Sequence, residues 1–157
     1  MATILERDGK PDYVVVDLLS AGAGVAGSNV FGTAVDFSTQ LAQPIDCNEG
    51  VWLMALSSVD LRLSSTSLSC VVHSDIQLPV AMAGKSAQVL ARVSPQTDHT
   101  VGDILTFVPQ SPVVRWVPVM PGTHRSIRVA LYDSTGAAWG LVVGQYTNVT
   151  LVLRRVS

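Results

Sequence analysis

The stretch RSIRVALYDSTGAAWGLVVGQYTNVTLVLRR, residues 125–155, decides the fold. In it Ile127, Val129 and Leu131 alternate with polar or small residues, and a similar alternation returns over residues 148–155. Successive side chains of a strand point to opposite faces, so this period of two predicts strands with one buried face. Between them, residues 133–136 form a turn cluster in which Gly136 is free to adopt positive φ, and residues 139–143 predict a further short strand.

The β pattern recurs upstream of this stretch. Further strands are expected over residues 13–19, 34–41, 51–63, 68–72, 86–93, 104–108 and 113–119. Within residues 51–63 the apolar phase changes at Ser57-Ser58, which predicts a β-bulge. Neither a helical period nor a fixed-period repeat is present in the sequence. Nine or ten short strands separated by turns predict one all-β domain, a sandwich or a barrel.

The composition limits the classes of protein to consider. The chain has 157 residues, of which 48% are hydrophobic, so a packed core is expected without disulfides or metal. Only 14% are charged, against about 25% in ordinary soluble domains. A surface this poor in charge suggests that much of the exterior is covered by partners. The net charge of −2 provides no general attraction to nucleic acid or to an anionic membrane.

Residues 1–10 lack the apolar region of a signal peptide, and no apolar run reaches the length of a membrane span. We therefore expect synthesis in the cytosol and no membrane insertion. Cys47 and Cys70 are isolated, so reduced, structural roles are expected, although a disulfide between them remains open. With three histidines and no ligand spacing, neither a metal nor a cofactor is expected.

The segment Gly22–Gly27 reads G-x-G-x-x-G directly after a predicted strand. In dinucleotide-binding proteins those glycines precede a helix whose N-terminus holds the pyrophosphate. Here they precede β-branched residues and another predicted strand, which favours a plain loop.

Two candidate catalytic arrangements are weak. His73-Ser74-Asp75 contains the residue types of a triad, but neighbours in a strand point to opposite faces. The carboxylates Asp17, Asp36 and Asp103 are candidates for an acid/base pair across strands, although such residues more often form turns or face solvent. Among the tryptophans, Trp52 and Trp139 lie in apolar runs and are expected in the core, whereas Trp116 is a candidate sugar-binding surface.

Two segments carry a resemblance to a known family. They are FSTQLAQPIDCNEGVWLMALSSVDL, residues 37–61, and IRVALYDSTG, residues 127–136, followed by NVTLVLRR, residues 148–155. Over residues 35–155 the chain resembles the penton, or minor capsid, proteins of polinton-like viruses, virophages and adintoviruses. Those proteins pair an F-x-x-x-L-x-x-P-I strand and a W-x-x-A-L strand with a C-terminal D-x-x-G turn and a V-x-L-x-L-R strand.

The resemblance implies a single jelly-roll β-sandwich of two antiparallel four-stranded sheets spanning residues 1–157, with residues 1–12 as an N-terminal arm. It implies a homopentamer at the five-fold vertices of an icosahedral double-stranded DNA virus capsid. The partners would be the major capsid protein and other minor capsid or spike proteins, with no specific nucleic acid. Such a protein is made in the host cytoplasm, resides in the virion, and acts by assembly and not as an enzyme.

Four arginines, Arg115, Arg125, Arg154 and Arg155, are expected at the subunit interface, because planar guanidinium groups pair well with carboxylates. Loops 21–28 and 95–101 are expected to face neighbouring capsomers. Other functions remain open. One alternative is another jelly-roll component of the virion: a spike base, a fibre-associated protein or a major shell protein. A second is a carbohydrate-binding β-sandwich that uses an exposed Trp116.

Overall fold

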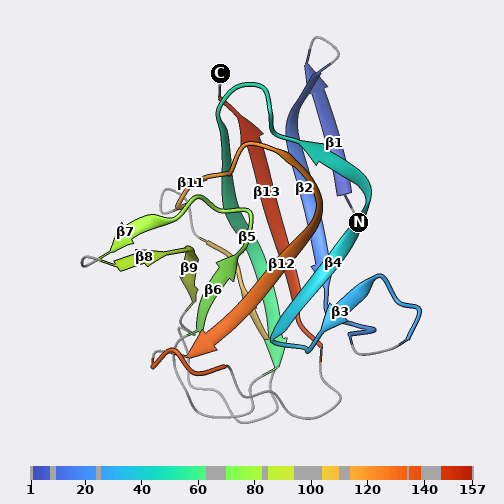
Figure 1. The fold of residues 1–157 in the computed structure, drawn as a ribbon. Helices are drawn as coiled ribbons and strands as arrows, with labels where there is room; N and C mark the ends of the chain where they lie inside the picture. The colour runs from blue at the N-terminus through green and yellow to red at the C-terminus, as the bar shows by residue number, and fades with distance from the viewer. Residues whose placement is uncertain are drawn as a thin grey trace.

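The computed structural model describes residues 2–7, 10–23, 26–62, 70–82, 85–93, 104–109, 114–133, 135–138 and 146–156. Within these ranges the chain forms thirteen strands and no helix (Figure 1). The strands are β1 (Ala2–Arg7), β2 (Lys10–Leu19), β3 (Val30–Gly32), β4 (Asp36–Asp46), β5 (Trp52–Arg62), β6 (Cys70–Ser74), β7 (Val80–Met82), β8 (Lys85–Ala87), β9 (Val89–Val93), β10 (Ile104–Phe107), β11 (Val117–Pro118), β12 (Thr123–Asp133) and β13 (Asn148–Arg155). No helix in the described ranges is long and apolar enough to cross a membrane.

The strands form two main sheets and a small hairpin. The six-stranded sheet has the order β1-β2-β13-β5-β10, with β11 also paired to β5. The five-stranded sheet has the order β3-β4-β12-β6-β9, and β7 pairs only with β8. Every pairing is antiparallel. The predicted all-β class with two antiparallel sheets is confirmed. The expected four strands per sheet are exceeded, because β1 and β3 extend one edge each and β11 adds to β5.

The core is formed mainly by aliphatic side chains on the inward faces of both sheets, joined by Phe37 and Trp52. Its centre comes from the stretch that opened the sequence analysis, where alternate residues of β12 and β13 are at most 1% exposed: Ile127, Val129, Leu131, Val149, Leu151 and Leu153. Burying each such side chain contributes about 1.5–3 kcal/mol relative to leaving it exposed. The period-two pattern therefore identified the two central strands of the sandwich.

The predicted bulge in β5 is confirmed. Thr150 of β13 lies opposite Ser58, but the next residue, Leu151, lies opposite Leu56, so Ser57 has no partner in this pairing. The extra residue shifts the alternation by one. As a result Met54 and Leu56 before it, and Val59 after it, all face the core.

The segment expected as an N-terminal arm, residues 1–12, contains β1 and the start of β2, which pair as a hairpin. Only Asp8 and Gly9 separate the two strands. An Asp-Gly pair in the sequence is a signal for a hairpin, and it was available before the structure. The register of this hairpin shifts between Leu5 and Glu6, which leaves Asp12 as the extra residue of β2.

Where the loops are described, their structure agrees with the turns predicted from the sequence. Gly136 has a φ of 86° and donates a backbone hydrogen bond of 3.2 Å to the Asp133 carbonyl, as expected for the predicted turn. The glycine loop leads through Ser28 directly into β3 and not into a helix, so the loop interpretation of residues 22–27 holds for its described part. The strand predicted over residues 139–143 and the loop predicted over residues 95–101 lie outside the described residues.

Both cysteines are free and buried, at opposite ends of β12. The Cys47 amide donates to the carbonyl of Gly122, just before β12, whereas Cys70 pairs with Asp133 at its other end. At about 3.3 Å per residue the strand separates them by roughly 30 Å, and a disulfide requires Cα atoms within about 7 Å. Burial raises the pKa of each thiol to about 12. The disulfide that the sequence left open is thus excluded within one folded chain.

We predict that neither thiol reacts with a maleimide at pH 8 while the protein is folded, because both are buried and protonated. Both should react at once in concentrated guanidinium chloride. The measurement is mass spectrometry of the labelled chain over time. Stoichiometric labelling of a protein that keeps its native β-sheet circular dichroism would contradict the burial of these two residues.

A second prediction concerns Gly32, the last residue of β3 before the tight turn into β4, whose φ is +112°. A Cβ at this position would overlap the carbonyl oxygen of Asp36 and lie 3.1 Å from the Cα of Phe37. We expect Gly32→Ala to lower the free energy of unfolding by about 2–4 kcal/mol, as measured by urea denaturation.

Gly136→Ala is the matched control. Gly136 also has positive φ, at +86°, but nothing lies within 4 Å of an added Cβ. In this variant the free energy of unfolding should fall by only about 1 kcal/mol, the cost of holding an alanine at positive φ. Equal losses at the two glycines would show that the predicted overlap with Asp36 has no energetic consequence.

Candidate functional site

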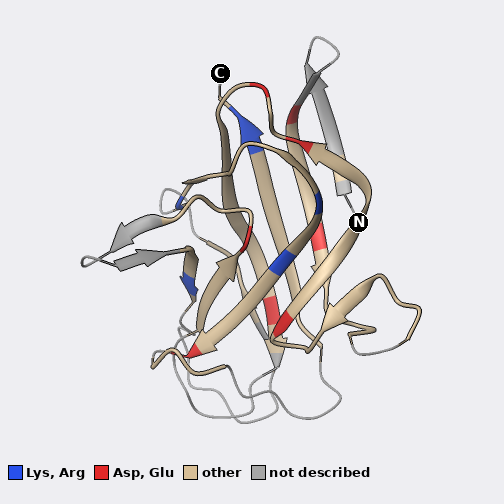
Figure 2. Cartoon of the chain, viewed as in Figure 1, with Lys and Arg blue, Asp and Glu red and all other residues tan. Residues whose placement is uncertain are grey.

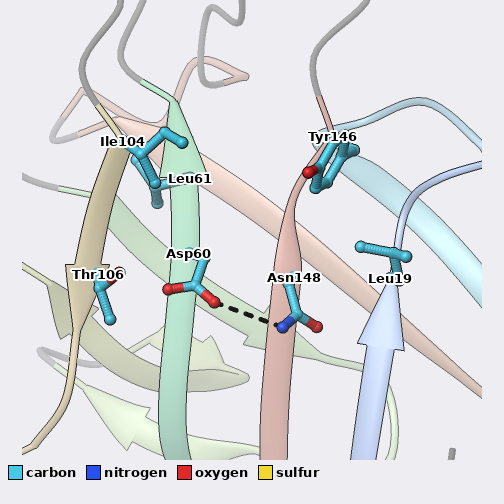
Figure 3. Close-up of a pocket in the computed structure, with 7 residues that line it drawn as sticks. All are labelled: Leu19, Asp60, Leu61, Ile104, Thr106, Tyr146 and Asn148. Carbon is cyan, nitrogen blue, oxygen red and sulfur yellow. Dashed lines mark hydrogen bonds between the residues drawn. The ribbon is translucent and has the colours of Figure 1, made fainter.

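The described residues form a groove on the outer face of the six-stranded sheet, where β2 ends and β13 begins. Four strands contribute directly opposed residues: Asn148 lies opposite Leu19 on one side and opposite Asp60 on the other, and Asp60 lies opposite Thr106. Their sequence neighbours Leu18, Val149 and Val59 are buried in the core. Alternation therefore directs this row outward (Figure 3).

This groove, hereafter the outer groove, has a volume of about 480 Å³ and is lined by Leu19, Asp60, Leu61, Ile104, Thr106, Tyr146 and Asn148. Three of its large side chains face solvent: Leu19 is 41% exposed, Ile104 63% and Tyr146 60%. Single exposed apolar residues are common on protein surfaces, but a cluster around a concave site is typical of an interaction surface.

Asp60 is the only carboxylate among the residues that line the outer groove. One of its oxygens accepts a long hydrogen bond of 3.4 Å from the Asn148 amide (Figure 3). One row further along the same face, Asp17 accepts a hydrogen bond of 2.8 Å from the Thr150 hydroxyl. Among the described residues, no cation forms an ion pair with Asp60. The outer groove thus combines apolar walls with one weakly satisfied negative charge.

Two of the four predicted interface arginines form contacts within the chain. The Arg154 guanidinium lies 4.0 Å from the ring centroid of Trp116, in a cation–π contact. Arg155 forms a salt bridge of 3.0 Å with Asp12, the bulged residue of β2. Arg115, next to Trp116 in sequence, is exposed. The structure therefore places Arg154 on the ring of Trp116, the sequence neighbour of Arg115. Arg155 follows Arg154 in β13 and points to the other face of the sheet.

Arg125 lies apart from the other three, in the five-stranded sheet. It is exposed at a break in the β12–β4 register: His124 lies opposite Ile45, whereas Ser126 lies opposite Gln40. On β4 the break therefore spans residues 41–44, of which Ala42, Gln43 and Pro44 are exposed. Within the described part of the chain, Arg125 has no salt bridge.

A polar cluster on the outer face of the five-stranded sheet was not predicted. Arg128 of β12 donates two hydrogen bonds, of 2.7 and 2.6 Å, to the two carboxylate oxygens of Asp36 on β4. The Asp75 carboxylate accepts from the Arg128 backbone N–H at 2.9 Å. His73 packs edge-on against Tyr132, with ring centroids 4.9 Å apart. Charged residues at outward positions of the predicted strands were the available signal, but alternation does not reveal which strands are neighbours.

The electrostatics of this cluster follow from its contacts. The hydrogen bond from Arg128 holds the pKa of Asp36 below its ordinary value. Partial burial raises the pKa of Asp75 and lowers that of His73. A shallow hollow of about 110 Å³ lies between these groups. Its charges are largely satisfied by one another, so the cluster ties β4, β12 and β6 together.

Within the described ranges, the catalytic candidates from the sequence do not come together in a reactive centre. Asp17 lies in the six-stranded sheet and Asp36 in the five-stranded sheet, so they do not pair, and Asp103 lies outside the described residues. Ser74 is buried, as expected for alternate faces in His73-Ser74-Asp75. No group of three described histidine, cysteine or acidic residues is placed to hold a metal ion.

The tryptophans are partly as predicted. Trp52 is buried, and its indole N–H donates to the Glu49 carbonyl at 3.0 Å. Trp139 lies outside the described residues. Trp116 is half-buried beneath the Arg154 guanidinium, which occupies one face of the ring.

Charged residues of both signs are dispersed over the described strands (Figure 2).

Comparison with known proteins adds no assignment: no family model matches the chain, and no curated protein matches it.

A pH-dependent prediction follows from the Asp36–Arg128 pair, whose side chains are 38% and 55% exposed. Because the folded-state pKa of Asp36 is lowered, the pair stabilises the fold above the unfolded pKa of about 4 and this contribution disappears as the pH falls through the folded value. We expect Asp36→Asn to cost about 0.5–1 kcal/mol at pH 7, given the solvent exposure of the pair, and almost nothing at about pH 2.

The measurement is a double-mutant cycle by chemical denaturation, combining Asp36→Asn with Arg128→Gln at both pH values. A coupling energy that is the same at pH 2 as at pH 7 would contradict an ionic origin.

Proposed function

We propose that this chain is a single-jelly-roll structural protein of a virus capsid, a penton protein that forms homopentamers at five-fold vertices. It acts by packing against copies of itself and against the major capsid protein, and not by chemistry on a substrate.

The observation that carries the proposal is the order in which the strands pair. The first long strand pairs with the last, β2 with β13, and the next pairs follow inward: β4 with β12, β5 with β10, and β6 with β9. This is the pattern of one long antiparallel ribbon folded over into two layers, which supports a jelly roll. In this interpretation β1, β3, β7, β8 and β11 are additions to an eight-stranded jelly roll.

Jelly rolls occur in capsid proteins and in carbohydrate-binding proteins, so the surface must distinguish them. The outer groove exposes Leu19, Ile104 and Tyr146 together, and only 14% of the residues are charged. Both features favour a surface that is covered in an assembly. The resemblance of residues 37–61 and 127–155 to penton proteins points the same way.

The carbohydrate-binding alternative is weaker because Trp116 is not a free platform. The Arg154 guanidinium stacks on one face of its ring, and sugar binding would use an aromatic face left open to solvent. A spike base or another jelly-roll shell protein remains the nearest alternative, and its oligomer symmetry would differ.

The test is the mass of the purified protein by light scattering over a range of concentrations. We expect particles of five chains, each of 16.6 kDa. A three-chain particle would favour a spike base. A protein that remains a single chain at millimolar concentration, with or without its shell partners, would contradict the proposal.

A further inference from the structure

We propose that the outer groove is the receiving half of a head-to-tail contact between copies of this chain, in which Arg125 of one copy enters the groove of the next and pairs with Asp60. This inference rests on the proposed function, because it assigns the contact that would close the ring.

The receiving side is suited to an arginine side chain. Asp60 supplies a carboxylate that accepts a long hydrogen bond of 3.4 Å from Asn148. Leu19 and Ile104, both largely exposed, provide apolar surface for the methylene groups of an arginine. The exposed ring of Tyr146 offers an aromatic face to the guanidinium. Charge, apolar contact and aromatic contact thus occur together in one concave site.

The donating side is an exposed irregular segment of the other sheet, which we call the arginine bulge: Arg125 of β12 with the exposed Ala42, Gln43 and Pro44 of β4. The register break between His124 and Ser126 leaves residues 41–44 of β4 without partners in the ladder with β12. Arg125 is exposed and forms no salt bridge with the described residues. Arg128, three residues on, is already held by Asp36, and Arg154 and Arg155 are held by Trp116 and Asp12.

The positions of the two patches determine the kind of contact. The outer groove lies on the six-stranded sheet at the end where Asn148 meets Asp60. The arginine bulge lies on the five-stranded sheet near the opposite end, where Cys47 bonds to Gly122. A patch that joins a different patch makes a heterologous contact, which closes into a ring when the rotation permits. Two patches that meet in a ring must lie at the same level along the symmetry axis. Because the groove and the arginine bulge lie at opposite ends of the strands, the axis of this ring must run across the strands and not along them.

The chemistry explains why an arginine is favoured over a lysine. A guanidinium is planar and more weakly hydrated than an ammonium, and it can bond both oxygens of a carboxylate. Asp60 has one oxygen free of the Asn148 bond in the single chain. A second copy would therefore find an acceptor oxygen that the Asn148 bond leaves available.

The experiment is a charge exchange on the full chain, measured as the concentration at which the wild-type assembly dissociates, by light scattering. We expect Asp60→Arg and Arg125→Asp each to raise that concentration at least tenfold. The double variant Asp60→Arg with Arg125→Asp should restore it to within a few-fold of wild type, because the pair is re-formed with its charges reversed.

Arg115→Asp is the matched control. Arg115 is also exposed but precedes Trp116 in sequence, next to β11 of the six-stranded sheet. Combined with Asp60→Arg it makes the same change in net charge, and it should not restore assembly. Asp60→Asn tests the site with a smaller change, since an amide keeps the shape and loses only the charge. Melting temperatures of all variants establish that each is folded.

The outcomes separate the two proposals. A wild-type protein that never assembles contradicts the proposed function, and the contact with it. A wild-type pentamer that is unaffected by folded Asp60→Arg or Asp60→Asn overturns the contact and leaves the proposed function standing. Restoration by Arg115→Asp as effective as that by Arg125→Asp also overturns it, because the effect would then be one of net charge alone.

Discussion

The structure depends on the position of β13 between β2 and β5. This strand pairs along its length with both neighbours and joins a segment near residue 15 to a segment near residue 55. Its inward residues Val149, Leu151 and Leu153 are fully buried, so sheet formation and core formation are one event. The partner layer repeats this arrangement with β12 between β4 and β6. Two strands close in sequence thus hold the centre of both layers.

The alternating pattern was sufficient to predict the strands with one buried face. It located β12 and β13, and it placed the bulge of β5 at Ser57 because the apolar phase changes there. It did not predict β1 or β3. Residues 2–7 have no clear alternation, and the Asp8-Gly9 pair was the signal that could have identified the hairpin. Strand β3 has only three residues, too few for a period to be recognised.

The outer groove could not be predicted from the sequence, because register creates it. Leu19, Asp60, Thr106 and Asn148 lie on four strands that are far apart in the chain. A slip of one residue in any pairing would direct these side chains inward. The Asp36–Arg128 pair is similar, since 92 residues separate its members. The four arginines were chosen from the sequence on residue type alone, because a guanidinium group pairs well with carboxylates. Whether each was already engaged within the chain, as Arg154 and Arg155 are, required the structure.

The pairing of β2 with β13 also has a consequence for biosynthesis. Neither β2 nor β5 has its common neighbour until residues 148–155 have left the ribosome. Until then the edges of β2 and β5 lack their shared partner strand, and their apolar faces cannot be fully buried. Pairings between distant segments form slowly, and unpaired strand edges favour aggregation in the meantime. The nascent chain should therefore complete this sheet only after residues 148–155 have emerged, and until then its yield in a cell should depend on protection by chaperones.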